Sequence, residues 1–306
     1  MRFGLNLLNF GPDAGPRSIA RWGELAEDAG FSFLTISDHV AITEDVFAEY
    51  QTPFYDPLIT LAYLAAATER VRLGTSVLVL PYRHPLLIAR SAANIDQLSG
   101  GRLFLGVGVG WAREEFEALD VGFAGRGRRS DEHLEVMRRC WAEEKVSHQG
   151  EFSSFPAVAT GPPPAQEGGI PIWIGGESEV AIRRAVERGD VWHPLRPLAG
   201  WLEDEGLPAL ARIAADSGRE APVVVPRILL DIASAPVAEE LRPLGRGSAE
   251  QIRADLEGLA ALGIEEVLLD TYDEAIAGAA DRQDDHLRLI ERFVSEVADP
   301  REGAAA

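Results

Sequence analysis

The most regular hydrophobic pattern in this chain lies between residues 71 and 116. The run 71–80 is apolar and rich in β-branched residues, without the alternation of a strand that has one wet face. It therefore predicts a strand buried on both faces, as in a parallel sheet. A helix should follow, because Pro85 suits a first helical turn and Gly100 suits a helix end. A second strand then runs into Gly106.

The same alternation of strand and helix extends over the whole chain. Strands are expected at 2–8, 31–37, 71–80, before Gly106, and at 171–175, 190–195, 223–233 and 266–271. Helices are expected at 17–29, 57–68, 85–99, 131–146, 178–188, 201–216, from Ser248 to Gly263, and at 283–297.

Eight such units predict an α/β fold, the closed (β/α)8 TIM barrel, as one domain over residues 1–306. Insertions are expected after strands 2 and 4: residues 41–56, and the proline-containing segment 148–169, which could form a lid edge. Residues 300–306 are expected to form a flexible tail. In such a barrel, functional residues lie at the carboxyl ends of the strands.

Composition narrows the class of protein. A formal net charge of −20 argues against binding to nucleic acid or an anionic membrane, because long-range repulsion would oppose both. The single cysteine, Cys140, excludes an intrachain disulfide. Neither a signal peptide nor a membrane-spanning segment is expected from the sequence, so we predict a cytoplasmic protein.

Asp38 and His39 end the second predicted strand. The functional interpretation is a histidine acid/base beside an aspartate that holds a ligand or orients the ring. An ordinary strand-end cap explains the same spacing about equally well.

Glycines mark two further strand ends. Gly106, Gly108 and Gly110, with Trp111 beyond, would let a backbone or a flat ligand approach closely, and we interpret them as one wall of a cofactor site. Their GxGxG spacing is not the GxGxxG of dinucleotide-binding proteins.

The run Ile174-Gly175-Gly176-Glu177 ends a strand where a helix begins. Backbone N–H groups and the positive end of the helix dipole could hold the phosphate of a cofactor there, although a simple tight turn fits equally well.

The remaining histidines and the single lysine carry less information. His84 and His193 follow strands and are expected to be hydrogen-bonded packing residues, although both could line the mouth, while His133, His148 and His286 are expected to face solvent. No histidine pair has the spacing of metal ligands, so no metal is expected. Lys145 is the only lysine and lies at the far end of a helix, which argues against Schiff-base chemistry.

Several segments together resemble the luciferase-like monooxygenase superfamily, and within it the branch of flavin- and deazaflavin-dependent oxidoreductases. They are GFSFLTISDHV, VRLGTSVLVLPYRHP, LSGGRLFLGVGVGWAREEFEALDVGF, PIWIGGESEVAIRRAVERGDVWHP and GSAEQIRADLEGLAALGIEEVLL. The resemblance covers nearly the whole chain and implies a TIM barrel with insertions. The Ser-Asp-His ending of strand 2 looks like the branch that binds coenzyme F420, a deazaflavin with a phosphate tail.

The resemblance implies roles for individual residues. Asp38 would hydrogen-bond the deazaflavin ring, His39 would be the acid/base, and Ser76–Val77 would be a cis peptide bond that forms a bulge behind the ring. Gly175 and Gly176 would receive the phosphate. The complete list of cofactor-binding residues that we predict is Asp38, Ser76, Val77, Gly108, Gly110, Trp111, Ile174, Gly175, Gly176 and Glu177.

The resulting prediction is an F420-dependent oxidoreductase that acts on an unidentified small organic substrate, as a homodimer by family resemblance. Trp111 and the scarcity of lysine argue against a sugar phosphate, because the related sugar-phosphate dehydrogenases have a glutamate at the position of Trp111 and use lysine to hold the phosphate. One alternative is an FMN-dependent monooxygenase with a reductase partner. Another is an F420- or flavin-binding barrel without turnover.

Overall fold

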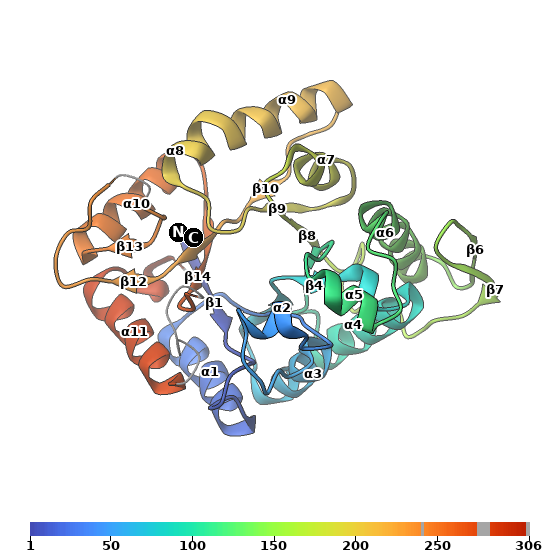
Figure 1. The fold of residues 1–306 in the computed structure, drawn as a ribbon, viewed down its shortest axis with the longest axis horizontal. Coiled ribbons are helices and arrows are strands. Elements are labelled where there is room, and N and C mark those ends of the chain that lie inside the picture. The colour runs from blue at the N-terminus through green and yellow to red at the C-terminus, as the bar shows by residue number, and fades with distance from the viewer. Residues whose placement is uncertain (240–241, 274–281, 304–306) are drawn as a thin grey trace.

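The computed structural model describes residues 1–239, 242–273 and 282–303, and its centre is a parallel β-barrel seen end-on in Figure 1. The barrel strands are β1 (Arg2–Leu7), β2 (Phe33–Ile36), β3 (Arg72–Thr75) with β4 (Leu78–Val79), β5 (Leu105–Gly108), β8 (Ile172–Gly175), β9 (Val191–His193), β10 (Val223–Val224) with β11 (Arg227–Leu229), and β14 (Glu266–Asp270). They form two parallel sheets, in the orders β11-β14-β1-β2-β3 and β10-β9-β8-β5-β4. Isolated parallel bridges, Leu73 to Leu103 and Leu195 to Arg227, join the two sheets on both sides. The predicted barrel is confirmed.

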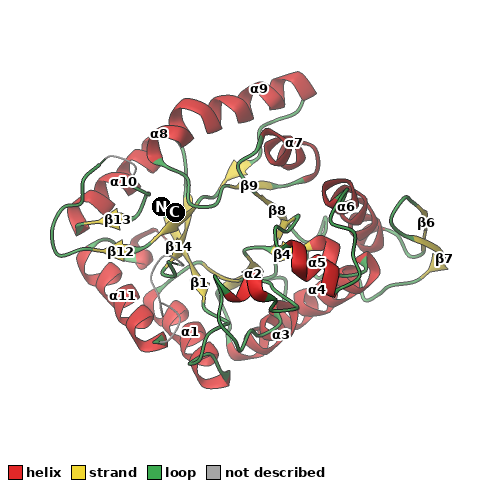
Figure 2. Cartoon of the chain, in the orientation of Figure 1, coloured by secondary structure: helices red, strands yellow, loops and turns green. Residues whose placement is uncertain are grey.

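Helices surround the barrel, as Figure 2 shows. They are α1 (Pro16–Ala29), α3 (Pro57–Ala67), α4 (Pro85–Ser99), α6 (Arg126–Ala142), α7 (Glu179–Arg188), the continuous α8 (Ala199–Trp201), η2 (Leu202–Gly206) and α9 (Leu207–Ser217), and then α10 (Ala249–Ala261) and α11 (Gln283–Glu296). Across the described residues, none of these helices combines the length and the apolar composition that crossing a bilayer requires.

The two insertions contain short elements of their own. The first holds α2 (Glu44–Phe47), and α5 (Arg113–Ala118) follows β5. An antiparallel hairpin, formed by β6 (Val146–Gln149) and β7 (Ser154–Val158), overlaps the start of the second insertion. Its turn is held by the Glu132 carboxylate, which accepts the N–H groups of residues 151–153. In Figure 1 the hairpin lies beyond α6, at the periphery of the molecule.

Two strands predicted as continuous are each divided. The first is interrupted at the Ser76–Val77 peptide bond, which is cis, as the resemblance implies. The second is interrupted at Pro226, which has no N–H to donate to a ladder. Beyond this second strand, β12 (Asp231–Ile232) pairs with β13 (Arg246–Gly247) outside the barrel.

Two boundary predictions were wrong. The helix expected at 131–146 occupies 126–142. Its glycine- and arginine-rich start has no apolar periodicity, so the sequence pattern did not mark it. Gly125, with φ 79°, turns the chain into the first turn of the helix. The expected tail at 300–306 begins instead with the 3-10 helix η4 (Pro300–Gly303), in which Pro300 is buried. Residues 304–306 lie outside the described part of the chain.

Aromatic rings fill the interior of the barrel. A Cβ at Gly4 would lie 2.1 Å from the Phe33 ring, and one at Gly74 would lie 2.3 Å from the Phe104 ring. Trp173 stacks on Phe104 with ring centroids 4.0 Å apart. The glycines therefore provide the room that the rings occupy.

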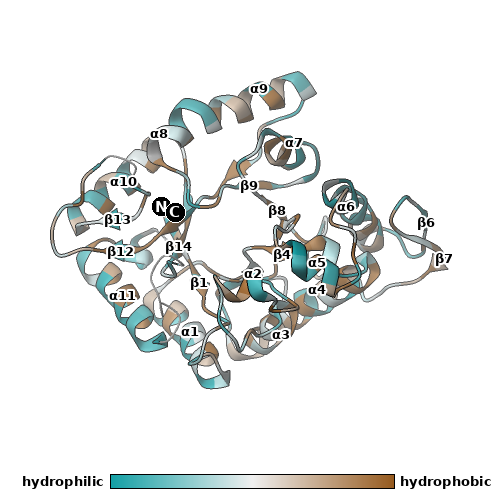
Figure 3. Cartoon of the chain, in the orientation of Figure 1, coloured by the Kyte–Doolittle hydropathy of each residue, from teal (hydrophilic) through white to brown (hydrophobic). Residues whose placement is uncertain are grey.

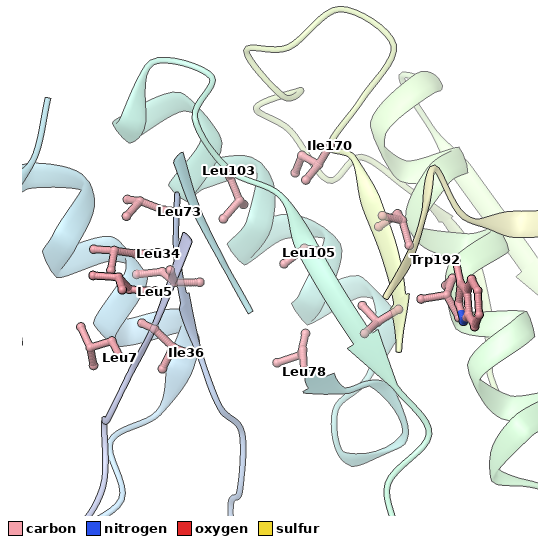
Figure 4. Close-up of a cluster of buried hydrophobic side chains, with 14 of the residues drawn as sticks. Leu5, Leu7, Leu34, Ile36, Leu73, Leu78, Leu103, Leu105, Ile170 and Trp192 are labelled. Carbon is pink, nitrogen blue, oxygen red and sulfur yellow. The ribbon is translucent and has the colours of Figure 1, made fainter. Parts of the chain in front are cut away.

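Outward-facing residues of the same strands form the main core. Figure 4 shows Leu5, Leu34, Leu73 and Leu105 projecting from neighbouring strands, and all four are buried. In Figure 3 the hydrophobic colour concentrates on the strands and inner helix faces, while the outer helix faces are hydrophilic. Because alternate strand residues point outward and the apolar helix faces point inward, the main core lies between the barrel and the helices.

We expect Gly74→Ala to lower the free energy of unfolding by about 1–3 kcal/mol, because the added methyl group meets the Phe104 ring. The matched control is Gly258→Ala on the exposed face of α10, where an added Cβ meets nothing within 4 Å. That variant should gain about 0.5–1 kcal/mol from helix propensity. Urea unfolding of the three proteins measures both effects, and equal stabilities would contradict the packing argument.

Candidate active site

A cavity of about 210 Å³ opens at the carboxyl-terminal ends of the barrel strands. The predicted residues that line it are Asp38, His39, Ser76, Val77, Gly108, Gly110, Trp111, Gly175 and Gly176. Tyr50, Tyr82, Leu195 and Arg227 also line it, although the sequence did not single them out. Two predicted residues are not part of the lining: the Ile174 side chain is buried in the core, and Glu177 is exposed.

His39 is held by a buried carboxylate. Its Nδ1 lies 2.7 Å from Glu115 Oε2, and the Glu115 side chain has no exposed surface. Because an ionised carboxylate can only accept, Nδ1 of His39 carries the proton of this bond. The other ring nitrogen, Nε2, is then the atom that a ligand in the cavity can reach.

Glu115 stands in the first turn of α5, where the helix dipole favours an acid. The N–H groups of Val40 and Ala41 donate to its Oε1, and the Tyr82 hydroxyl donates to its Oε2. Burial alone would raise the pKa of Glu115, but His39 and these donors together hold that pKa below its usual value. Glu115 is therefore an ionised residue with all its partners supplied by the protein.

Asp38 is paired with Arg83 in a bidentate ion pair, with N–O distances of 2.6 and 2.9 Å. The N–H of Val79 also donates to Asp38, and Arg83 reaches Asp56 at 2.8 Å. Burial raises the pKa of Asp38, and the Arg83 guanidinium acts against this rise. Both Asp38 oxygens are thus bonded within the protein and tie β4 to the end of β2. The direct contact between Asp38 and a cofactor ring stays a prediction.

Two of the cavity glycines make room for the Val77 side chain. A Cβ at Gly108 would lie 2.7 Å from one Val77 methyl group, and a Cβ at Gly175 would lie 2.9 Å from the other. Gly106 instead makes room for the carbonyl oxygen of Thr75, at 2.0 Å from its ideal Cβ. Val77 therefore protrudes from the cavity wall between two glycines.

A polar layer forms the floor below Val77. Arg227 donates to the Ser76 carbonyl at 2.8 Å and to the Asp270 carboxylate at 2.8 and 3.0 Å. Arg196 binds the same carboxylate at 2.7 Å. Burial would raise the pKa of Asp270, but the charges of Arg227 and Arg196 lower it below its usual value.

His193 belongs to this floor as a neutral residue. Burial lowers the pKa of His193 to about 4, and its Nδ1 donates to the Val225 carbonyl. Its Nε2 therefore accepts from the Ser76 hydroxyl, 2.9 Å away. The prediction of a hydrogen-bonded packing residue is confirmed.

The Gly175-Gly176 turn leads into α7, whose N-cap Ser178 accepts from the Ala181 N–H. Gly176 has φ 117°, a conformation that favours glycine, and a Cβ there would lie 3.0 Å from Ala181. The turn thus presents bare backbone to the cavity beside a helix N-terminus.

The other histidines lie away from the cavity lining. His84 caps α4 by accepting the Leu86 N–H, as a hydrogen-bonded structural residue. The expectation that His133, His148 and His286 face solvent was wrong, because all three are buried. Burial lowers the pKa of His133 to about 4, and its Nδ1 bonds with the Leu80 carbonyl. Among the described residues, no group of three histidine, cysteine or acidic side chains could hold a metal ion.

The sequence did not single out Glu115, Arg83, Arg227 or Asp270. Asp270 is the last residue of β14, so the rule that placed Asp38 and His39 could have found it, whereas Arg227 is the first residue of β11 and does not follow from that rule. Glu115 and Arg83 carried no such signal, since one belongs to a short helix and the other to a loop.

Known proteins resemble this chain in sequence and in fold. An uncharacterized protein of Mycobacterium tuberculosis is 30% identical over 320 residues, which cover 97% of this chain and 99% of the relative. The F420-dependent glucose-6-phosphate dehydrogenase of Nocardia farcinica is 33% identical over 214 residues, or 67% of this chain and 61% of the dehydrogenase. The crystal structure of monooxygenase RslO1 from Streptomyces bottropensis shares the fold, with a TM-score of 0.80 and 23% identity over 97% of this chain and 98% of RslO1.

Residues 1–288 match the family model described as luciferase-like monooxygenase. This match spans the barrel strands and every residue of the cavity lining. The chain belongs to the luciferase-like monooxygenase family.

Proposed function

We propose that this chain is an oxidoreductase that uses coenzyme F420 to move a hydride to or from a small organic substrate. The observation that carries the proposal is the His39–Glu115 pair in the cavity, directly after the Ser37-Asp38 ending of β2. That ending is the feature by which the sequence resembles the F420-binding branch. The relation to the Nocardia F420-dependent dehydrogenase agrees with this choice.

The cavity fits a flat cofactor with a phosphate. Gly108, Gly175 and Gly176 leave bare backbone along one wall, and a side chain at any of them would press on Val77 or Ala181. Val77 would support one face of the ring, and the Gly176 turn would receive the phosphate at the start of α7. When bound, the deazaflavin supplies the carbon that accepts or donates the hydride.

The protein would contribute proton handling. Glu115 fixes the His39 ring by accepting its Nδ1 proton, while Nε2 is left for the substrate. None of the described residues donates to or accepts from Nε2 in the hydrogen bonds of the structure. His39 would therefore exchange a proton with the substrate oxygen, while Glu115 acts through His39 as a positioning residue.

A second candidate is an FMN-dependent monooxygenase. The likeness of the fold to monooxygenase RslO1 favours it, because the two barrels agree over nearly their whole length. A barrel without turnover is a weaker candidate, because it would not need a buried, fully bonded carboxylate behind His39.

The predicted homodimer and cytoplasmic location stay predictions. Helix α3 has no charged residue and exposes Ile59 and Tyr63 on its outer face. Such a surface would suit contact with a second copy of the chain.

The first prediction is that F420 binds at least tenfold more tightly than FMN, a difference of about 1.4 kcal/mol. Fluorescence titration of the purified protein with each cofactor, at one salt concentration, measures it. Equal affinities, or FMN that copurifies with the protein, would favour the monooxygenase instead.

The second prediction is that Gly176→Asp abolishes cofactor binding while the fold is retained, because it puts a negative charge where the phosphate would lie. Gly176→Ala, which adds only a methyl group, should bind more weakly than wild type but more tightly than Gly176→Asp. Gly168→Asp is the matched control, since Gly168 also has positive φ (85°) and lies in an exposed loop outside the cavity. Unchanged affinity in folded Gly176→Asp would mean that the phosphate binds elsewhere.

The third prediction concerns the proton. His39→Asn should keep F420 affinity while turnover falls about a hundredfold or more, the usual worth of a positioned acid or base. A panel of alcohols, enones and nitro compounds must first identify a substrate. Wild-type turnover in this variant would make His39 structural.

Glu115→Gln separates positioning from chemistry. Because its pKa is lowered, Glu115 is ionised at neutral pH and can only accept the Nδ1 proton of His39, which leaves Nε2 for the substrate. An amide at this position offers both a donor and an acceptor, so Glu115→Gln no longer fixes the tautomer of His39, and turnover should fall, by less than in His39→Asn, while F420 affinity is kept. Glu114→Gln, on the same helix but exposed, is the control and should keep wild-type turnover; equal turnover in both variants would mean that Glu115 does not position His39.

A further inference from the structure

Three aromatic rings from two segments of the chain converge on His39. The rings of Tyr50, Phe54 and Trp111 lie 5.1, 5.4 and 5.7 Å from the His39 ring, measured between centroids. Tyr50 and Phe54 come from the insertion after β2, and Trp111 follows β5. The histidine that faces the cavity is therefore set in a wall of three aromatic rings, Tyr50, Phe54 and Trp111.

Part of this wall is uncovered. Trp111, one of its three rings, lines the cavity and is 45% exposed; Phe47 on α2, which is 54% exposed, is not among the lining residues. Helix α2 carries Phe47, and Trp111 lies just before helix α5. The two helices lie beside each other at the barrel opening in Figure 1, and the Glu114 N–H of α5 donates to the Asp45 side chain of α2. Burying such aromatic surface is favourable, and it selects ligands with flat apolar faces.

The charged side chains that line the cavity are already paired within the protein. Among the described lining residues, the charged side chains other than His39 are Asp38 and Arg227. Arg83 binds Asp38, and Asp270 binds Arg227. Glu115 is covered by His39 and by its backbone donors. A charged substrate would lose its hydration without meeting an opposite charge that is not already paired, which is costly.

We propose that this site binds an uncharged compound with a flat or ring-shaped apolar group, whose polar atom faces Nε2 of His39. The role of this compound as substrate rests on the function proposed above. The binding preference itself follows from the aromatic wall and the paired charges, and it can be measured whether or not a cofactor is bound.

The experiment compares three ring ketones of similar size: uncharged cyclohexanone, anionic oxocyclohexane carboxylate and the cationic N,N-dimethyl-oxopiperidinium ion. Calorimetric titrations use the full chain, once with saturating F420 and once without cofactor but with inorganic phosphate, so that the anion site proposed at the Gly176 turn is occupied in both. We expect cyclohexanone to bind at least tenfold more tightly than either ion under both conditions. A failure to bind F420 would refute the proposed function, whereas the titrations without cofactor would still decide the ligand class.

Trp111→Lys tests the wall directly. The new cation should reverse the preference, so that the anionic ketone binds at least tenfold more tightly than cyclohexanone. Tyr63→Lys is the matched control, because Tyr63 is 46% exposed on the outer face of α3 and the change of charge is the same. This control should bind the three ketones in the same order of affinity as the wild type. Equal or tighter binding of either ion by the wild type, or a reversal in the control as well, would overturn the proposal.

Discussion

The limited space inside the barrel is the constraint on which the rest of the structure depends. Phe33, Phe104 and Trp173 fill the interior as one packed layer, and Gly4 and Gly74 are the positions that make room for it. Arg72 lies over Phe33 and Phe104 and is paired with Glu266 on the side opposite the cavity. Because this layer closes the barrel to solvent from one end, chemistry is confined to the other end.

Above the aromatic layer, the interior is polar and its charges are compensated. Asn6 links Thr35 to Asp270, and Asp270 holds Arg227 and Arg196. Removing one partner of a buried ion pair costs about 3–5 kcal/mol, so each pair fixes the strand ends and loops that carry it. The same logic applies to Asp38 with Arg83 and to Glu115 with His39. The cavity therefore has rigid walls before any ligand binds.

Glycines at the cavity serve protein packing as well as ligand access. Gly108 and Gly175 face the two methyl groups of Val77, and Gly106 faces the backbone of Thr75. A glycine-rich strand end is thus compatible with a cofactor site and also with a close approach of neighbouring strands. The sequence could indicate that something comes close at these positions, but only the fold identifies Val77 and Thr75 as the neighbours.

The sequence by itself determined the order of strands and helices, because the periods of 2 and 3.6 residues and the turn residues between elements are local properties. It also placed Asp38, His39 and Gly175 at the cavity, since these positions follow from being at strand ends. Only the tertiary structure decided the partners: Glu115 for His39, Arg83 for Asp38 and Asp270 for Arg227. These pairs join residues 43 to 76 positions apart that meet only when the barrel closes, so no local pattern records them. Burial of His133, His148 and His286 was missed for the same reason, because a polar residue is buried where distant groups satisfy its hydrogen bonds.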